Sequence, residues 1–215
     1  MLNVCSFLVT LAALDLAIIV SASQPSQQSE AIAHALQSGG LRAAARVAGH
    51  YETYHTTQSE ALADDLTELQ SISDSIVVAR VKGRLSSALS PSGDSISTDY
   101  GLEVDESIRG RLHASAVFRL RLPGGAVVFE DGTTATVRTD DLERIVPGRR
   151  YVLFLKDLSD HELLSLGLQS AFGFKADEAT IDPLAATDTP IVIRYRGSLS
   201  GMFLQSVRFI ANQKR

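Results

Sequence analysis

The densest group of side chains able to bind a metal ion lies between residues 50 and 64. His50, Glu52 and His55 are followed by Glu60 and Asp64. The zinc-binding helix motif needs two histidines four residues apart, with a glutamate after the first, so that both imidazoles reach one ion. Here the two histidines are five residues apart, and on an extended segment they would face opposite ways. We therefore interpret the segment as a polar connector and predict no metal or other cofactor, with a metal site as the alternative.

A serine nucleophile is the second chemistry to consider. It needs a base and an orienting acid close by, and serines are too common in this chain for one to stand out. Residues 197–201 superficially resemble a nucleophile elbow, but Leu199 occupies the central position that the elbow gives to serine. The remaining histidines, His34, His113 and His161, are isolated. We predict no catalytic residue, and a hydrolase whose site forms from distant residues stays the alternative.

The start of the chain is typical of an exported protein. Residues 4–20 form an apolar run, and the small residues 21–23 that follow fit a signal-peptidase site. A membrane anchor would need about 20 apolar residues and basic flanks, and it would bury Asp15. We predict that residues 1–23 are a cleaved signal peptide and that the protein is periplasmic or extracellular. Because no basic residue precedes the run, an uncleaved anchor or a misplaced start codon stays the alternative.

Composition narrows the class of protein further. The chain has 215 residues, a net charge of −5 and one cysteine, Cys5. Removing residues 1–23 removes Cys5 and Asp15, which leaves a net charge of −4 and no thiol or disulfide. This mild acidity argues against general binding of nucleic acid. The remaining 192 residues (215 − 23) are enough to build a core without disulfides.

Residues 24–72 have helical spacing. Ile32 and Leu36 share a face, and an alanine-rich stretch follows the glycine pair at 39–40. Thr57 and Glu60 have the spacing of a capping box. The apolar residues after this box recur every three or four positions: Leu62, Leu66, Leu69 and Ile72. We predict a helical prefix that packs on the domain that follows.

From Ser75 onward the spacing changes to the two-residue alternation of half-buried strands. The strands are predicted at residues 76–85, 96–108, 116–122, 127–130, 133–139 and 151–155, then at 164–168 and around Phe172 and Phe174. Asp131 and Gly132 predict a tight hairpin with positive φ at both residues. The unbroken apolar run 151–155 predicts a strand buried on both faces. We expect a mainly β (α+β) fold, with a small closed or partly open antiparallel β-barrel, OB-like, over residues 73–182, because closure removes exposed edges.

Charged residues alternate in sign between the first three predicted strands. Basic side chains on the first and third strands flank acidic ones on the second: Arg80, Lys82 and Arg84, then Asp99, Glu103 and Asp105, then Arg119 and Arg121. A simple meander would pair them across the sheet, at about 0.2–1 kcal/mol for each exposed pair. The alternative is a groove for an anion or a polysaccharide. Because no exposed aromatic residues are interleaved with these charges, we favour ion pairs.

Residues 183–215 are predicted to form an edge strand at 191–195 and an amphipathic C-terminal helix packed on the barrel. Ser198 or Ser200 is a candidate cap. One helix face carries the apolar residues Leu199, Met202, Phe203, Val207 and Ile210. A membrane or partner contact is the alternative role of this face.

Five segments carry a resemblance to a known family. They lie within residues 73–81, 98–104, 121–125, 147–155 and 169–172. In these segments the chain resembles an uncharacterised family of exported bacterial proteins, over about residues 70–180. The resemblance implies a small barrel of the OB-like or netrin-like type and an exported location. It implies no reaction and no functional residue, because the matching motifs are turns and core strands.

We therefore expect a non-catalytic binding or interaction module of the cell envelope or extracellular space. Its partner would be an unknown protein or envelope component rather than nucleic acid, and the mature chain would have no transmembrane segment. The loops 86–95 and 139–149 are the predicted contact regions, because rigid scaffolds place recognition on loops. The alternative is an extracytoplasmic hydrolase. A pocket joining histidine, serine and carboxylate would favour the hydrolase, and an interior filled with apolar side chains would favour the binding module.

Overall fold

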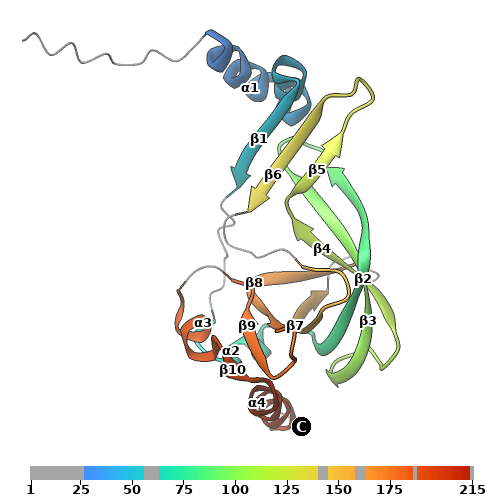
Figure 1. Cartoon of the computed structure of the whole chain (residues 1–215), viewed down its shortest axis with the longest axis vertical. Coiled ribbons are helices and arrows are strands. Elements are labelled where there is room, and N and C mark those ends of the chain that lie inside the picture. The colour runs from blue at the N-terminus through green and yellow to red at the C-terminus, as the bar shows by residue number, and fades with distance from the viewer. Residues whose placement is uncertain (1–26, 56–62, 140–144, 158–162, 186–187, 214–215) are drawn as a thin grey trace, which may run out of the picture.

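The computed structural model describes residues 27–55, 63–139, 145–157, 163–185 and 188–213 (Figure 1). The predicted signal peptide therefore lies outside the described residues. In chain order the elements are α1 (Gln27–Ala48), β1 (His50–His55), α2 (Leu66–Ser71), β2 (Ser75–Leu89), β3 (Ile96–Arg109), β4 (Val117–Pro123), β5 (Gly125–Val128), β6 (Thr134–Thr139), β7 (Arg150–Asp157), β8 (Leu163–Phe174), β9 (Thr180–Pro183), α3 (Pro190–Tyr195), β10 (Ser198–Leu199) and α4 (Ser200–Asn212). The predicted mainly β fold is confirmed. None of the described helices is both long enough and apolar enough to cross a membrane.

Five strands pair in an order that returns to its first member. β2 pairs with β3, β3 with β4, β4 with β8, β8 with β7, and β7 with β2. The β4–β8 ladder is parallel, and the other four are antiparallel. β9 and β10 extend the sheet beyond β8. The order β2–β3–β4 is the meander that the alternating charges predicted.

The inner faces of the five strands build one apolar core. Alternate residues point to the same side of a strand, so every second residue contributes. The strand residues of this cluster are Val77, Ala79, Val81, Leu102, Val104, Phe118, Leu120, Leu122, Tyr151, Leu153, Leu155 and Ala171. The phenolic oxygen of Tyr151 accepts a hydrogen bond of 2.9 Å from the backbone N–H of Val146, which satisfies its one polar group. The interior is thus filled by side chains.

Helices α2, α3 and α4 cover the outer face of β2, β7 and β8 (Figure 1). Val152 and Phe154 face these helices, while their neighbours in β7 face the inner core, so this strand is buried on both faces as predicted. Phe172 lies at the centre of the helical side, and its ring contacts those of Phe154, Tyr195 and Phe203. The aromatic contacts therefore connect β7 and β8 to α3 and α4.

The helix predicted after Thr57 begins later than its capping box implied. Thr57 and Glu60 lie outside the described residues, and α2 starts at Leu66. Asp65 is the N-cap, and its side chain accepts a hydrogen bond of 2.9 Å from the backbone N–H of Glu68. Leu66 and Leu69 are buried against the helical side of the strands, so the expected packing of this helix is confirmed.

Two predictions for the C-terminal region are corrected. Residues 191–195 form helix α3 rather than an edge strand. Pro190 favours a helix start because its fixed φ suits the first helical position. The short helix buries Ile191 and Val192. The N-cap of α4 is Leu199, not Ser198 or Ser200, and the Ser200 hydroxyl donates to the carbonyl of Glu178 instead.

The face of α4 is divided. Phe203 and Val207 are buried, which confirms that the helix packs on the strands. Leu199 and Met202 belong to the predicted apolar face but are 56% and 65% exposed. The buried part of the predicted apolar face is therefore smaller than expected, and Ile210 is only partly buried.

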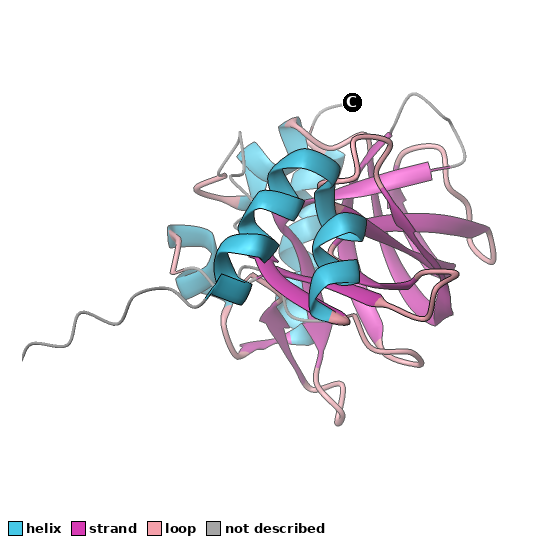
Figure 2. Cartoon of the chain, turned by 90° about the horizontal axis from the view of Figure 1, so that it is seen from above, coloured by secondary structure: helices cyan, strands magenta, loops and turns pink. Residues whose placement is uncertain are grey.

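The N-terminal region is not wholly helical, because His50–His55 forms β1. This strand pairs in parallel with β6, which pairs with β5 in antiparallel fashion. Helix α1 covers one face of this small sheet, where Leu41 and Ala45 contact Ala135 and Val137. Figure 2, which looks down from the α1 end, shows α1 as two segments lying in front of the strands.

The break in α1 is also a contact point. Gly40 has φ 68°, and a Cβ there would lie 2.4 Å from the carbonyl oxygen of Gly93. The backbone N–H of the next residue, Leu41, donates to this oxygen at 2.8 Å. Only glycine allows so close an approach with this backbone conformation. The helix break thereby fastens α1 to the β2–β3 turn.

The β5–β6 hairpin differs from the predicted two-residue turn. The backbone N–H of Phe129 donates to Thr133 O, and that of Gly132 donates to Phe129 O. Gly132 has φ 80°, whereas Asp131 does not have a positive φ. The connection is therefore a three-residue loop closed by Gly132, a common longer alternative to the tight hairpin.

Candidate ligand-binding cleft

A cleft of about 660 Å³ lies between the small sheet and the adjoining ends of β2, β3 and β4. Figure 1 shows the small sheet (β1, β6 and β5) beside the upper ends of β2 and β3. The lining consists of Tyr54, Arg84, Thr98, Tyr100, Leu122, Pro123, Gly124, Gly125, Ala126, Thr136, Val137, Arg138, Thr139 and Ile145. It combines two tyrosines, two arginines and three threonines, and no Asp or Glu of the described residues is among them.

One wall of the cleft is the face of the small sheet that α1 leaves uncovered. Ala135 and Val137 of β6 point toward α1, so the residues that alternate with them point away from it. Arg138 is one of these, and Tyr54 is its partner in the β1–β6 ladder. The Tyr54 side chain is 59% exposed. The small sheet therefore presents an aromatic ring and a guanidinium group side by side.

Arg84 reaches the opposite wall because β2 is irregular. The β2–β3 register shifts between Val81 and Gly83, and again after Arg84. These shifts place Arg84 opposite Tyr100, whose inward-facing side chain also lines the cleft. Strand bulges commonly re-aim a side chain in this way. The prediction that Arg84 joins the cross-strand ion pairs is therefore wrong.

The two arginines of the cleft differ in their partners. Arg138 forms an ion pair with Glu52, with Nε 2.5 Å from Oε1. Arg84 donates to Ser87 Oγ at 2.8 Å and to the carbonyl of Ala126 at 3.2 Å, and it forms no ion pair with a described carboxylate. These two bonds position the Arg84 guanidinium while leaving its charge unneutralised by the described part of the chain.

Two glycines, Gly124 and Gly125, form part of one wall of the cleft. Gly125 has φ 131°, and a Cβ there would lie 2.1 Å from Thr98 Oγ1. The Thr98 hydroxyl donates to the carbonyl of Gly124 at 2.7 Å and also lies 2.8 Å from Ser87 Oγ. Gly125 thus permits close packing of β5 on β3 and leaves this part of the cleft open.

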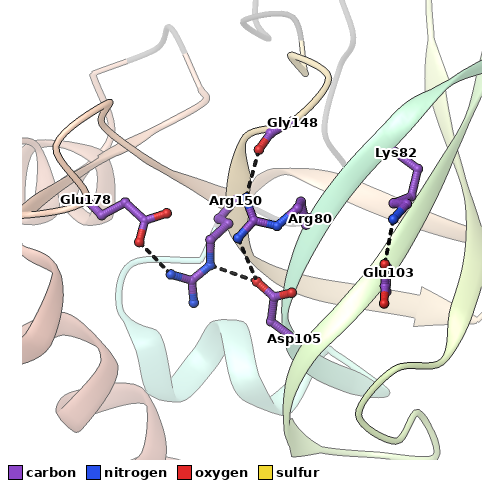
Figure 3. Close-up of polar contacts among 7 residues, drawn as sticks. All are labelled: Arg80, Lys82, Glu103, Asp105, Gly148, Arg150 and Glu178. Carbon is purple, nitrogen blue, oxygen red and sulfur yellow. Dashed lines mark hydrogen bonds and ion pairs between the residues drawn. The ribbon is translucent and has the colours of Figure 1, made fainter.

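The outer face of β2, β3 and β4 carries the predicted ion pairs. Lys82 lies 2.7 Å from Glu103, and Arg80 lies 3.7 Å from Asp105. Figure 3 shows that Arg150 extends the second pair, because it contacts both Asp105 and Glu178 at 2.8 Å. The charge pattern of these strands is therefore structural over most of its length.

Asp99 is the most enclosed carboxylate of this face. Its side chain is 5% exposed, and it accepts two hydrogen bonds from Arg121 and one from Arg119, at 2.7–2.9 Å. These hydrogen bonds, that of Arg121 above all, hold the pKa of Asp99 below its usual value in spite of the opposing effect of burial. Asp99 thus fixes β3 to β4 as a charged group.

A second cavity of about 490 Å³ lies at the start of β7 and the end of β8. Arg149, Tyr151, Lys175, Asp177 and Asp182 are among its lining residues. Lys175 and Asp182 form an ion pair at 2.9 Å. In the described part of the chain, neither cavity is lined by a histidine or a serine.

Two of the residues considered for metal binding lie close together, because His50 Nε2 is 3.9 Å from Glu52 Oε2. His50 Nδ1 also lies 2.5 Å from Thr134 Oγ1, and Glu52 pairs with Arg138. The backbone N–H of Asp64 donates to Glu68, while the side chain of His55 and all of Glu60 lie outside what the structure describes. Over the described ranges, no three His, Cys, Asp or Glu side chains gather as metal ligands.

The isolated histidines and the two predicted contact loops have separate places in the fold. His34 and His113 are exposed, and His161 is outside the described residues. Residues 86–89 belong to β2, and the turn that follows contacts α1 through Gly93. Thr139 and Ile145 line the cleft, while residues 140–144 are not described. Thus only the second loop adjoins the cleft through its described ends.

No family model matches the chain, and no curated protein matches its sequence.

Proposed function

We propose that the protein is an exported, non-catalytic binding module of the cell envelope or extracellular space, and that it binds its ligand in the cleft between the small sheet and β2–β4. The observation that carries the proposal is the cleft lining: the exposed side chain of Tyr54 and the guanidinium of Arg84, which pairs with no described carboxylate, line the same volume. Its volume is within the range of about 300–1,000 Å³ that is typical of small-ligand sites.

The finer fold assignment is part of the same proposal. We propose that the strands β2, β3, β4, β8 and β7 form a small OB-like barrel. Their pairing order, which returns to β2, and the single parallel pair β4–β8 support this. The apolar side chains that fill the interior leave ligand binding to the open end and the attached loops.

The alternative is an extracytoplasmic hydrolase whose site is formed by distant residues. It would require a serine, a histidine and a carboxylate within hydrogen-bond reach of one another beside a cavity. The cleft and the second cavity are instead lined by aromatic, basic and threonine or aspartate side chains. The geometry therefore supports binding better than hydrolysis.

The test is photo-crosslinking in the native cell combined with mapping of the mature N-terminus. A photoreactive amino acid replaces Tyr54 in the cleft or, as a control, the 72% exposed Val117 on β4. We expect a mature chain that begins near Gln24 and one reproducible adduct at position 54 but not at 117. A chain that retains Met1, or adducts that are equal at both positions, would contradict the proposal.

A further inference from the structure

We infer that the ligand is an acidic sugar, a short segment of a polysaccharide whose rings carry a carboxylate or sulfate group. This inference rests on the proposed function, because it names the class of ligand for the same cleft. Three features of the lining support it: an unneutralised cation, an exposed aromatic ring, and polar groups spread along both walls.

The described residues that line the cleft carry a charge opposite to that of the chain. The protein has a net charge of −5, yet Arg84 and Arg138 line the cleft without an accompanying described carboxylate in the lining. Glu52 of β1 is paired with Arg138. Among the described residues no carboxylate pairs with Arg84, and a guanidinium group binds carboxylate or sulfate oxygens through charge-assisted hydrogen bonds.

Arg84 is held ready for such a contact. Its two hydrogen bonds to Ser87 Oγ and Ala126 O both come from one nitrogen, Nη2. The Nε–H and Nη1 groups donate to no partner within the described chain. Because the side chain is already anchored, less rotamer freedom is lost when an anion binds.

The rest of the lining suits a sugar ring better than an isolated ion. The flat face of Tyr54 is exposed, and an aromatic ring packs well on the apolar C–H face of a pyranose while its hydroxyl stays in water. Thr136 and Thr139 on one wall supply hydroxyl groups, and the glycine main chain at 124–125 forms part of the other wall. Such groups hydrogen-bond to sugar hydroxyls, which an acidic peptide lacks.

The test is calorimetric titration of the full chain, in the form that the cell produces, with matched probes. The probes are a tetramer of galacturonate, its carboxyl-reduced neutral counterpart, a sulfated tetramer of the neutral sugar, a tetraglutamate peptide and inorganic sulfate. The variants are Arg84→Gln and Tyr54→Ala. Arg194→Gln on α3 is the control, since this arginine is stacked on Tyr195 away from the cleft lining.

We expect at least one acidic tetramer to bind about tenfold or more tightly than the neutral tetramer, and Arg84→Gln to remove this preference. Tyr54→Ala should weaken binding of the acidic tetramer about tenfold, since it removes the ring contact, whereas Arg194→Gln should leave binding unchanged. Circular dichroism of each variant checks that a loss of binding is not a loss of fold.

Each other result overturns the inference. Equal binding of acidic and neutral tetramers would refute the acidic class, and tighter binding of the peptide would refute the sugar. Sulfate alone binding as tightly as the sulfated tetramer would reduce the site to an anion site. No binding of either acidic tetramer would reject the inference as a whole. The proposed binding function is judged separately, by capture at position 54 in the cell, so a failure of this inference can be told apart from a failure of the proposed function.

Discussion

Both ends of strand β2 pair with β3, but their surroundings differ. From Ser75 to Ala79 the strand is buried on both faces, with Ile76 and Val78 under the helices and Val77 in the inner core. Beyond the register shift between Val81 and Gly83, Arg84 lines the cleft and Leu85 is 58% exposed. One end of the strand therefore contributes to stability, while the other forms a wall of the proposed binding site.

The same contrast separates the basic residues of β2. Arg80 precedes the register shift between Val81 and Gly83, and Lys82 lies within it; both pair with carboxylates of β3. Arg84 follows this shift and pairs with no described carboxylate. Position relative to the bulge, rather than residue type, decides which cation is neutralised. Substitutions on the two sides of the shift should thus separate stability from ligand binding.

The largest contrast is expected between two aliphatic residues of this strand. Ile76 is 1% exposed in the cluster under the helices, and Leu85 is 58% exposed. Ile76→Ala should lower the free energy of unfolding by about 2–5 kcal/mol, because it leaves a cavity in a packed core. Leu85→Ala should change it by about 0.5 kcal/mol or less. Urea unfolding of both variants measures the difference, and equal losses would remove the distinction between the two ends.

A second contrast compares Gly125, which lines the cleft, with Gly83 of β2, which is not among the described lining residues. Gly125→Ala would place a Cβ 2.1 Å from Thr98 Oγ1 at φ 131°, whereas Gly83 has no atom within 4 Å of the corresponding position. We expect Gly125→Ala to cost about 1–3 kcal/mol or more, because the backbone is strained and Thr98 must move. Gly83→Ala should cost less. Thermal unfolding checks the order, and a reversed order would contradict the close packing of β5 on β3.

The pH dependence of stability should identify Asp99 as the central ion-pair group. Its folded-state pKa lies below its unfolded value near 3.9, so its contribution is present above that value and is lost as pH falls through the folded pKa. Asp99→Asn should lower the free energy of unfolding by about 1–3 kcal/mol at neutral pH. Urea unfolding at about pH 7 and pH 3 should show this deficit shrink in acid. A deficit independent of pH would mean that the charge of Asp99 does not stabilise the fold.

The smallest effect is expected for the exposed pair of Lys82 and Glu103. Its side chains are 56% and 36% exposed, so Lys82→Gln should lower the urea midpoint only slightly, and less at high salt. Arg84→Gln is the matched control and should show no salt-dependent loss. The midpoint of urea unfolding at low and high salt measures both variants. The same salt-dependent loss in each would place Arg84 among the structural pairs.

Much of the fold follows from local patterns. The alternation from Ile96 to Asp105 and the apolar run 151–155 predict β3 and β7, because burial of one or both strand faces determines these patterns directly. The charge signs of β2, β3 and β4 also predict their order, since opposite charges pair across neighbouring strands.

The cleft was not predicted, because long-range contacts create it. His50–His55 has little apolar alternation, and its partner, β6, begins at Thr134. The sequence around Tyr54 therefore does not predict that this residue pairs with Arg138. The one local signal for the turned Arg84 is Gly83, since an isolated glycine within a strand pattern is typical of a bulge. The helix over residues 191–195 was missed because its β-branched residues favour strands, while tertiary burial of Ile191 and Val192 favours α3.

The most direct test compares charge reversal at two arginines, with both stability and capture at position 54 measured. Arg84→Glu in the cleft should abolish capture by the photoreactive residue and leave the thermal midpoint nearly unchanged. Arg121→Glu should lower the midpoint, because it separates Asp99 from its main partner, and should leave capture intact at a temperature where the variant is folded. Loss of capture in Arg121→Glu with unchanged stability, together with full capture in Arg84→Glu, would contradict the account and return the outer face to consideration as the binding groove.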